Sequence, residues 1–326
     1  MPTLEIDGQE ITVEDGLNVI QAAEQAGIEV PHYCYHPGLS ISGNCRMCLV
    51  EIEKMPKLQI GCNTRVSDGM VVKTNSKRAK HAQAAVLEFI LINHPIDCPI
   101  CDQAGECKLQ DYYMLYGAYT SEMGLEAKVH KGKVVDLGPE VVLDEERCIL
   151  CARCTRFLDE VTKTGELGIF ERGDHSRISL FPGKKLDNRY SGNVVDVCPV
   201  GALTSKDFRF KSRVWYLEKT PSTCTRCATG CNIDIYHRQG EIYRFRPRQN
   251  PEVNEYWMCD EGRNSYKSFQ QASRIPNPLV RGEASFEIAS WADAAKKTAQ
   301  ILLQVKEEHG TAAIAGIVGA KATNEE

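Results

Sequence analysis

Fifteen cysteines and one histidine are the residues through which this sequence could do chemistry. The cysteines fall into four groups: Cys34, Cys45, Cys48 and Cys62; Cys98, Cys101 and Cys107; Cys148, Cys151, Cys154 and Cys198; and Cys224, Cys227, Cys231 and Cys259. The N-terminal residues have the character of neither a signal peptide nor a transit peptide, so we expect a reducing compartment, where structural disulfides are rare. Dense cysteine there indicates metal binding, and the odd number also argues against a disulfide framework.

The first group predicts a [2Fe–2S] cluster. Ten residues separate Cys34 from Cys45, two separate Cys45 from Cys48, and thirteen separate Cys48 from Cys62. Such a cluster needs four thiolates from a loop that wraps closely around it, and a glycine such as Gly43 lets the backbone approach. On spacing alone, a four-cysteine zinc site is the alternative.

The second group has three cysteines and predicts a [4Fe–4S] cluster with His94 as its fourth ligand. His94 lies four residues before Cys98 and directly before Pro95, where a helix has to end. A lone histidine near a helix end is more often a cap or a surface residue. Here the other three groups have four cysteines each and no cysteine is left over, so His94 completes sixteen ligands for four clusters.

The third and fourth groups each predict a [4Fe–4S] cluster. Cys148, Cys151 and Cys154, with the distant Cys198-Pro199, follow the bacterial ferredoxin signature with its last cysteine displaced. Two-cluster ferredoxins have eight cysteines, so we expect one cluster here and the remains of a second, empty site at about 165–181. The fourth group resembles the [4Fe–4S] domain that opens the molybdopterin oxidoreductases.

The elements that must position these residues can be predicted from local patterns. Alternating runs at 4–6 and 11–13 flank Asp7-Gly8, a hairpin signal, and Asp15 is expected to cap a helix that ends at Gly27. Further predictions, in chain order, are a strand at 48–53, helices at 76–93 and 105–116, a linker or short hairpin at 126–142, paired strands at 232–237 and 241–246, a helix at 288–303, and an apolar strand-like run at 312–318.

Together these elements predict an α+β multidomain chain. The predicted domains are a β-grasp, plant-type-ferredoxin-like [2Fe–2S] domain at 1–76; a helical [4Fe–4S] domain with one histidine and three cysteine ligands at 77–120; a bacterial-ferredoxin-like domain with a single [4Fe–4S] cluster at 121–216; a small β-rich [4Fe–4S] domain of the molybdopterin-oxidoreductase type at 217–274; and the start of a truncated molybdopterin-oxidoreductase-like domain at 275–326.

The order and spacing of the four groups resemble the large iron–sulfur subunit of respiratory complex I, the NADH-quinone oxidoreductase. The resemblance covers about residues 1–275 and is carried by the segments 32–51, 93–111, 148–157 and 194–204. It implies an electron-transfer subunit of that enzyme, which receives electrons from an NADH-oxidising flavoprotein subunit and passes them through its clusters to other iron–sulfur subunits and on to quinone. It also implies a bacterial cytoplasmic location, on the inner membrane through the complex, and a fourth cluster off the main path.

The runner-up is the electron-carrying subunit of a soluble NAD-linked hydrogenase or formate dehydrogenase. These subunits share the first two cysteine groups, and many of them carry eight cysteines in the third region. The single-cluster pattern of this chain therefore favours complex I.

Several functions are disfavoured by the sequence. There is no acid–base pair, no nucleophile with its base and no G-x-G-x-x-G loop, so we expect no substrate chemistry and no flavin in this chain. Glu261 stands where molybdopterin enzymes usually have a lysine, so we expect no molybdopterin. The formal charge of −5 argues against nucleic-acid binding. No run approaches ~18 apolar residues, so membrane association is expected to be indirect.

Basic residues outside the cysteine groups are predicted to have simpler roles. Residues 206–213 interleave lysine and arginine with phenylalanine and lie close to Trp215, which favours a subunit-contact face, and the same is expected of the arginines at 244–248. Arg147, Arg153 and Arg156 flank the third group, where they either raise the potential of its cluster or are solvated.

Overall fold

The computed structural model describes residues 1–118, 120, 123–271, 275–317 and 319. Its first part is a five-stranded mixed sheet in the order β2-β1-β5-β3-β4, with β1 parallel to β5. The strands are β1 (Thr3–Ile6), β2 (Gln9–Thr12), β3 (Leu49–Ile52), β4 (Gln59–Ile60) and β5 (Val71–Lys73). Helix α1 (Val19–Gln25) lies on this sheet, and its buried Val19 and Ala23 pack with Ile6, Val50 and Val72. The sequence predicts this hairpin, this helix and a later strand as parts of a β-grasp fold.

The cap of α1 differs from the prediction. The side chain of Asn18, not Asp15, accepts a hydrogen bond from the Gln21 amide (3.0 Å), and the Gln21 side chain accepts one from the Asn18 amide (3.0 Å). Asp15 instead accepts a hydrogen bond from the Gly16 amide, at 2.9 Å. The reciprocal box satisfies two otherwise unpaired backbone donors, so Asn18 is the better cap.

Two helices form the second part. α2 (Lys77–Leu91) begins after its cap Ser76 and ends before His94, as predicted. A short 3₁₀ turn, η1 (Cys98–Ile100), precedes α3 (Lys108–Tyr116), which begins three residues later than expected. The reason is Gly105, whose φ of +86° cannot continue a right-handed helix.

The third part combines a small sheet, a hairpin and two helices. The antiparallel sheet has the order β10-β7-β6, and β8 pairs with β9 in a hairpin at the predicted remains of a second cluster site, where Leu167 and Ile178 are buried. The elements are η2 (Leu125–Ala127), β6 (Val135–Asp136), β7 (Val141–Leu143), η3 (Glu145–Arg147), α4 (Arg153–Glu160), β8 (Leu167–Phe170), η4 (Gly173–His175), β9 (Arg177–Leu180), α5 (Asn193–Val197), β10 (Leu203–Ser205) and η5 (Val214–Tyr216).

The fourth part is an antiparallel sheet of β11 (Glu218–Thr223), β12 (Asn232–Arg238) and β13 (Glu241–Pro247), followed by the short helices α6 (Asp260–Arg263) and α7 (Tyr266–Phe269). The strand pair β12–β13 was expected at nearly these positions. β11 was not predicted as a strand.

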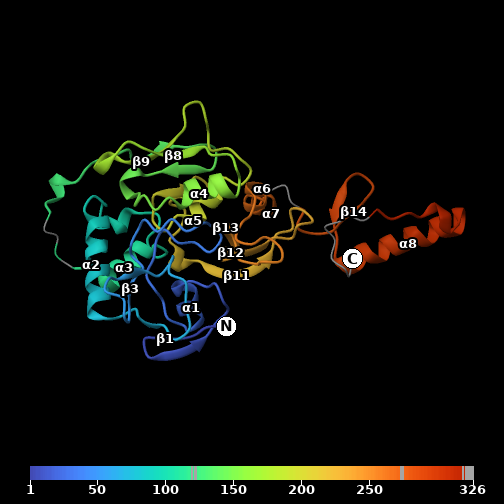
Figure 1. Ribbon diagram of the computed structural model, residues 1–326. Coiled ribbons are helices and arrows are strands. Elements are labelled where there is room, and N and C mark those ends of the chain that lie inside the picture. Colours follow the sequence, from blue (N-terminus) through green and yellow to red (C-terminus); the bar gives the residue numbers. More distant parts are fainter. Residues whose placement is uncertain (119, 121–122, 272–274, 318, 320–326) are drawn as a thin grey trace.

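The C-terminal segment stands away from the other parts in Figure 1. It consists of β14 (Leu279–Arg281), β15 (Phe286–Ile288), α8 (Trp291–His309) and η6 (Thr311–Ala313), and α8 buries none of its residues. The helix expected at 288–303 therefore exists, shifted toward the C-terminus. The strand expected at 312–318 is wrong for 312–317, where residues 311–313 form η6 and no described strand pairs with the residues that follow; residue 318 lies outside the described residues.

No helix in the part of the chain that the structure describes is long and apolar enough to cross a membrane.

Candidate metal centres

The four cysteine groups define four sites, which we call the first to the fourth site in chain order, with His94 included in the second. In the first site, Cys34, Cys48 and Cys62 are each 1% exposed. The amide of Cys34 donates a hydrogen bond to the Cys45 sulfur, at 3.4 Å. Hydrogen bonds with the thiols of Cys45 and Cys62 lower the pKa of Cys34, and the Cys62 thiol likewise lowers the pKa of Cys48. The structure therefore brings all four predicted ligands of this site together.

The second site is a cavity lined by all four of its predicted ligands, His94, Cys98, Cys101 and Cys107. The Nδ1 atom of His94 is buried and has no hydrogen-bond partner among the described residues. Burial, with a smaller effect from Arg147, lowers the pKa of His94 to about 4. The imidazole is therefore neutral at pH 7, as a metal ligand must be, and its unpaired nitrogen would cost about 1–3 kcal/mol if nothing bound it.

Lys128 fixes the backbone next to this histidine. Its ammonium donates hydrogen bonds to the carbonyls of Leu91 (2.9 Å), Ile92 (2.7 Å) and His94 (3.1 Å). These carbonyls lie at and just beyond the C-terminal end of α2, where backbone acceptors have no partner within the helix. Lys128 was missed by sequence reasoning, and no local pattern could have found it, since 34 residues separate it from His94.

The third site is a mainly apolar cavity lined by Cys148, Cys151, Cys154 and Cys198. Leu150 and Ala152 between the first three cysteines have left-handed φ angles of +52° and +59°. These two turns wrap the chain around the cavity. Burial raises the pKa of Cys148 to about 12 and that of Cys151 to about 11.

The fourth site is closed by a backbone hydrogen bond and lined by a glycine. The amide of Cys224 donates to the carbonyl of Cys231 (2.8 Å), and the amide of Gly262 donates to the sulfur of Cys259 (3.3 Å). A β-carbon on Gly262 would lie 3.1 Å from the Cys224 sulfur and 3.3 Å from that of Cys259. Charges on the other thiols, Cys227 included, add to burial in raising the pKa of Cys231. The structure thus gathers these four residues as well.

Glu261, which stands where molybdopterin enzymes usually have a lysine, is directed toward Arg226. The Arg226 Nε atom donates to a Glu261 carboxylate oxygen at 2.7 Å, and both side chains are exposed.

The third and second sites adjoin. The amide of Lys108 donates to the carbonyl of Pro199 at 3.2 Å, and a β-carbon on Gly201 would lie 2.4 Å from the Cys101 sulfur. Val200 lines the third-site cavity, whereas Gly201 lines the second-site cavity. The short segment after Cys198 is therefore the wall between the two sites.

The third and first sites adjoin as well. Arg156 on α4 donates to the carbonyls of Cys34 (2.5 Å) and Cys151 (3.5 Å), which belong to the two different sites. Asn44 donates to the carbonyl of Leu150 at 3.1 Å. The loop that carries the first site therefore lies against the loop that carries the third.

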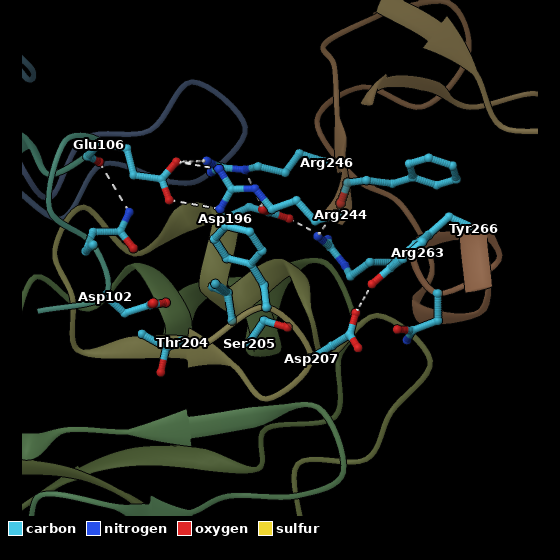
Figure 2. A pocket seen from close by; sticks show the side chains of 15 residues that line it. Asp102, Glu106, Asp196, Thr204, Ser205, Asp207, Arg244, Arg246, Arg263 and Tyr266 are labelled. Carbon is cyan, nitrogen blue, oxygen red and sulfur yellow. Dashed lines mark hydrogen bonds and ion pairs between the residues drawn. The ribbon is translucent and has the colours of Figure 1, made fainter. Parts of the chain in front are cut away.

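The fourth part is joined to the second and third parts by a network of ion pairs, which lines the pocket in Figure 2. Glu106 accepts hydrogen bonds from Arg244 (2.9 and 2.7 Å) and Arg246 (3.0 Å), and Asp196 accepts them from Arg246 (3.0 Å) and Arg263. The prediction that Arg244 and Arg246 form an external subunit-contact face is therefore wrong. Facing carboxylates on other parts of the chain draw them inward.

The three arginines near the third group also have distinct places. The Arg147 guanidinium lines the second-site cavity, not the third, and is only 7% exposed, so it is not solvated. It donates to Asp97 (2.9 Å) and Asp144 (2.8 Å). Arg153 lines the third-site cavity, and Arg156 spans the first and third sites.

The donors of the four sites, thiols and one imidazole, fit iron–sulfur clusters and also zinc. Within the described ranges, no group of three or more histidine, cysteine, aspartate or glutamate side chains is arranged to hold a single metal ion.

Four family models match the chain in succession. Residues 1–77 match a 2Fe-2S iron–sulfur cluster binding domain, and residues 83–122 match the NADH-ubiquinone oxidoreductase-G iron–sulfur binding region. Residues 138–204 match the ferredoxin-like domain of NADH-quinone oxidoreductase subunit 3, and residues 217–271 match the molybdopterin oxidoreductase Fe4S4 domain. The chain is therefore an iron–sulfur protein with ferredoxin-like 2Fe–2S and 4Fe–4S binding domains.

Curated relatives show which iron–sulfur proteins the chain is similar to over most of its length. The G subunit of the NADH-quinone oxidoreductase of Rickettsia felis is 45% identical over 97% of this chain and 46% of the relative. The same-named protein of Streptomyces coelicolor is 44% identical over 94% of this chain and 37% of the relative. The mitochondrial NADH dehydrogenase [ubiquinone] iron–sulfur protein 1 of Solanum tuberosum is 44% identical over 96% of this chain and 42% of the relative. Over nearly its whole length the chain is similar to these large iron–sulfur subunits of complex I, and it spans less than half the length of the relatives.

A solved structure is similar to a smaller share of the chain. It is a chain from an NAD+-reducing [NiFe]-hydrogenase in the H2-reduced state, with a TM-score of 0.57 and 28% identity. The match covers 65% of this chain and 91% of the hydrogenase chain.

Proposed function

We propose that this chain carries electrons within an NADH-quinone oxidoreductase, from an NADH-oxidising flavoprotein subunit toward quinone, and does no substrate chemistry of its own. The observation that carries the proposal is the contiguity of three sites, with the third site sharing a wall with the second and arginine contacts with the first. Bound clusters would each accept and release one electron, and close spacing permits tunnelling between them.

The residues at the four sites assign the cofactors. Cys34, Cys45, Cys48 and Cys62 would hold one [2Fe–2S] cluster. Three [4Fe–4S] clusters would be held by His94, Cys98, Cys101 and Cys107; by Cys148, Cys151, Cys154 and Cys198; and by Cys224, Cys227, Cys231 and Cys259. The unpaired Nδ1 of the neutral His94 supports its place among these ligands. Neither flavin nor molybdopterin is part of the proposal, and the domain limits given above remain predictions.

The contacts support a central place for the third site. Because it adjoins both of the others, it would lie between them on the path, and we place the entry of electrons at the first site and their exit at the second. The fourth site reaches the rest through ion pairs and through Trp257, whose ring stacks on His36 (5.4 Å between centroids) and contacts Phe157 (4.8 Å). The contacts named here join it to the rest through side chains, which fits a position off the path.

We infer the partners and the location from the likeness to complex I subunits. The donor would be the flavoprotein subunit and the acceptor another iron–sulfur subunit, with membrane contact through the complex at the cytoplasmic face of a bacterial inner membrane. Phe210, Trp215 and Tyr216 lie near the second site and are 62%, 57% and 56% exposed, which suits a docking surface at the exit. Nucleic acid is not among the proposed partners.

Metal analysis and EPR of the anaerobically purified chain test the proposal. We expect roughly fourteen irons and fourteen acid-labile sulfides per chain, and signals from one binuclear and three cubane centres on reduction. Zinc without sulfide would overturn it.

The likeness to the hydrogenase chain favours one alternative function, that of an electron-carrying subunit of a soluble NAD-linked hydrogenase or formate dehydrogenase. Affinity purification of the chain from its host distinguishes them. Complex I predicts that membrane quinone-reducing subunits come with it, and the alternative predicts a nickel–iron hydrogenase or a formate dehydrogenase subunit.

A further inference from the structure

Arg153 occupies an unusual position between two sites. It is the first residue of α4 and lines the third-site cavity together with all four of that site's cysteines. One terminal nitrogen donates to the carbonyl of Val197 (3.2 Å), next to Cys198, and the other donates to the carbonyl of Tyr35, next to Cys34. The guanidinium is therefore held by backbone from both the third and the first site.

One hydrogen-bond donor of Arg153 and its positive charge both lack a partner of the usual kind. Its Nε–H is buried and has no hydrogen-bond partner among the described residues, and no ion pair between its guanidinium and a carboxylate is found among them. Three other arginines also have a buried, unpaired Nε, but each has a carboxylate: Arg244 has Glu106, Arg248 has Asp234 and Arg263 has Asp196. In this respect Arg153 differs from all three.

No carboxylate is among the charged groups that act most strongly on Arg153. Burial lowers the pKa of His36 to about 4 and also lowers that of His32, so both imidazoles are neutral at pH 7. Arg156 is a like charge. The remaining neighbours are the sulfurs of Cys34, Cys151 and Cys198. A guanidinium stays protonated, so this buried cation needs a counter-charge, and burying it without one would be costly.

We propose that Arg153 is the shared counter-ion of the first and third sites, with its Nε–H donating to a sulfur in the third site and its charge favouring the reduced state of both. This deepens the proposed function and rests on it. One electron leaves the first site and one arrives at the third, and no proton moves because the guanidinium keeps its own. Arg153 touches the third-site cavity itself but reaches the first site only through the Tyr35 carbonyl, so it favours reduction of the third site more and draws the electron forward.

The test is an EPR-monitored redox titration of the cluster-loaded full chain carrying Arg153→Gln. We expect at least a tenfold fall in the one-electron reduction equilibrium constant of the third site, a shift of about −59 mV. We expect a smaller fall at the first site and none at the second, where Arg147 is already paired. Arg153→Lys keeps the charge and should recover most of the shift.

Arg156→Gln is the comparison variant, because Arg156 lies one turn further along α4 and donates to the backbone of both sites, at Cys34 and Cys151, but its guanidinium does not line the third-site cavity. It should change the third-site constant less than threefold. An unchanged third-site potential in Arg153→Gln with full iron content, or equal shifts in both glutamine variants, overturns the inference. If Arg153→Gln loses the third-site signal, Arg153→Lys decides: a potential near the wild type supports the inference, and a full shift overturns it. Absence of both signals in the wild type would instead overturn the proposed function.

Discussion

Gly201 lies so close to Cys101 that a β-carbon on the glycine would be 2.4 Å from the cysteine sulfur, although 100 residues separate the two in sequence. Real β-carbons do not approach another atom so closely, so either the wall between the second and third sites or the Cys101 side chain would have to move. The second and third sites can therefore lie this close together only because residue 201 has no side chain.

Gly201→Ala is therefore expected to disturb the second site selectively. The second-site EPR signal should fall at least tenfold while the first-site signal stays at wild-type intensity. Gly262→Ala is a graded comparison, because its β-carbon would lie 3.1 Å or more from the nearest sulfurs, and it should only weaken the fourth-site signal. Gly316→Ala has open space around it and should change no signal. Normal second-site intensity in Gly201→Ala would contradict the prediction.

His94 is the next residue to test. A neutral imidazole replaces a thiolate, which leaves the second site less negative, and in Rieske centres this replacement raises the potential. His94→Cys should therefore lower the second-site potential if the cluster survives, and His94→Ala should lose the cluster. His81→Cys, on the exposed face of α2, is the control and should leave the redox titration unchanged. If His94→Cys gives a wild-type titration and spectrum, His94 is not a ligand.

Glu106 gives a prediction about stability. It accepts three hydrogen bonds from Arg244 and Arg246 and is 17% exposed, so Glu106→Gln leaves two partly buried guanidinium groups with a missing charge. Breaking a buried ion pair costs about 3–5 kcal/mol, so unfolding in urea should begin at a clearly lower concentration. Glu261→Gln removes the carboxylate of an exposed pair with Arg226 and should cost at most about 1 kcal/mol. Similar losses in the two variants would show that the network in Figure 2 contributes little.

Local patterns in the sequence were sufficient for much of this architecture. The ends of α2, the β12–β13 pair and most members of each ligand group depend on residues near one another in the chain, such as Ser76 at the start of α2 and Pro95 after its end. The contacts that place the sites relative to one another do not: 138 residues separate Arg244 from Glu106, and 34 separate Lys128 from His94. Such partners become visible only when the chain is folded.

The errors have the same origin. Aspartate is a common N-cap residue, but Asn18 and Gln21 form a reciprocal capping box, so Asn18 and not Asp15 caps α1. The apolar run at 312–317 has the composition of a strand, but no strand among the described residues pairs with it. Arg244 and Arg246 look like surface residues until Glu106 and Asp196 are placed opposite them.

Trp215 allows a test of the proposed exit surface. It is 57% exposed and lies beside Gly105, which in the sequence stands between two cysteines of the second site. The guanidinium of Arg213 lies 5.7 Å from the centre of the Trp215 ring. Exposed aromatic residues that become buried in an interface often contribute about 2 kcal/mol or more to binding. Trp215→Ser should therefore weaken binding of the acceptor iron–sulfur subunit by about thirtyfold, measured by titration of purified partners, while the potentials of the chain stay unchanged.

Phe181→Ser is the control for this surface. Phe181 is 43% exposed and packs on Phe170 of the β8–β9 hairpin, at a ring distance of 5.2 Å, and neither residue lines the second-site cavity. Its loss should leave the affinity within twofold of the wild type. If both variants bind equally well, the acceptor does not dock on this face. If Trp215→Ser also shifts the second-site potential, Trp215 acts on the site itself, because a residue that serves only in docking leaves the isolated chain's potentials unchanged.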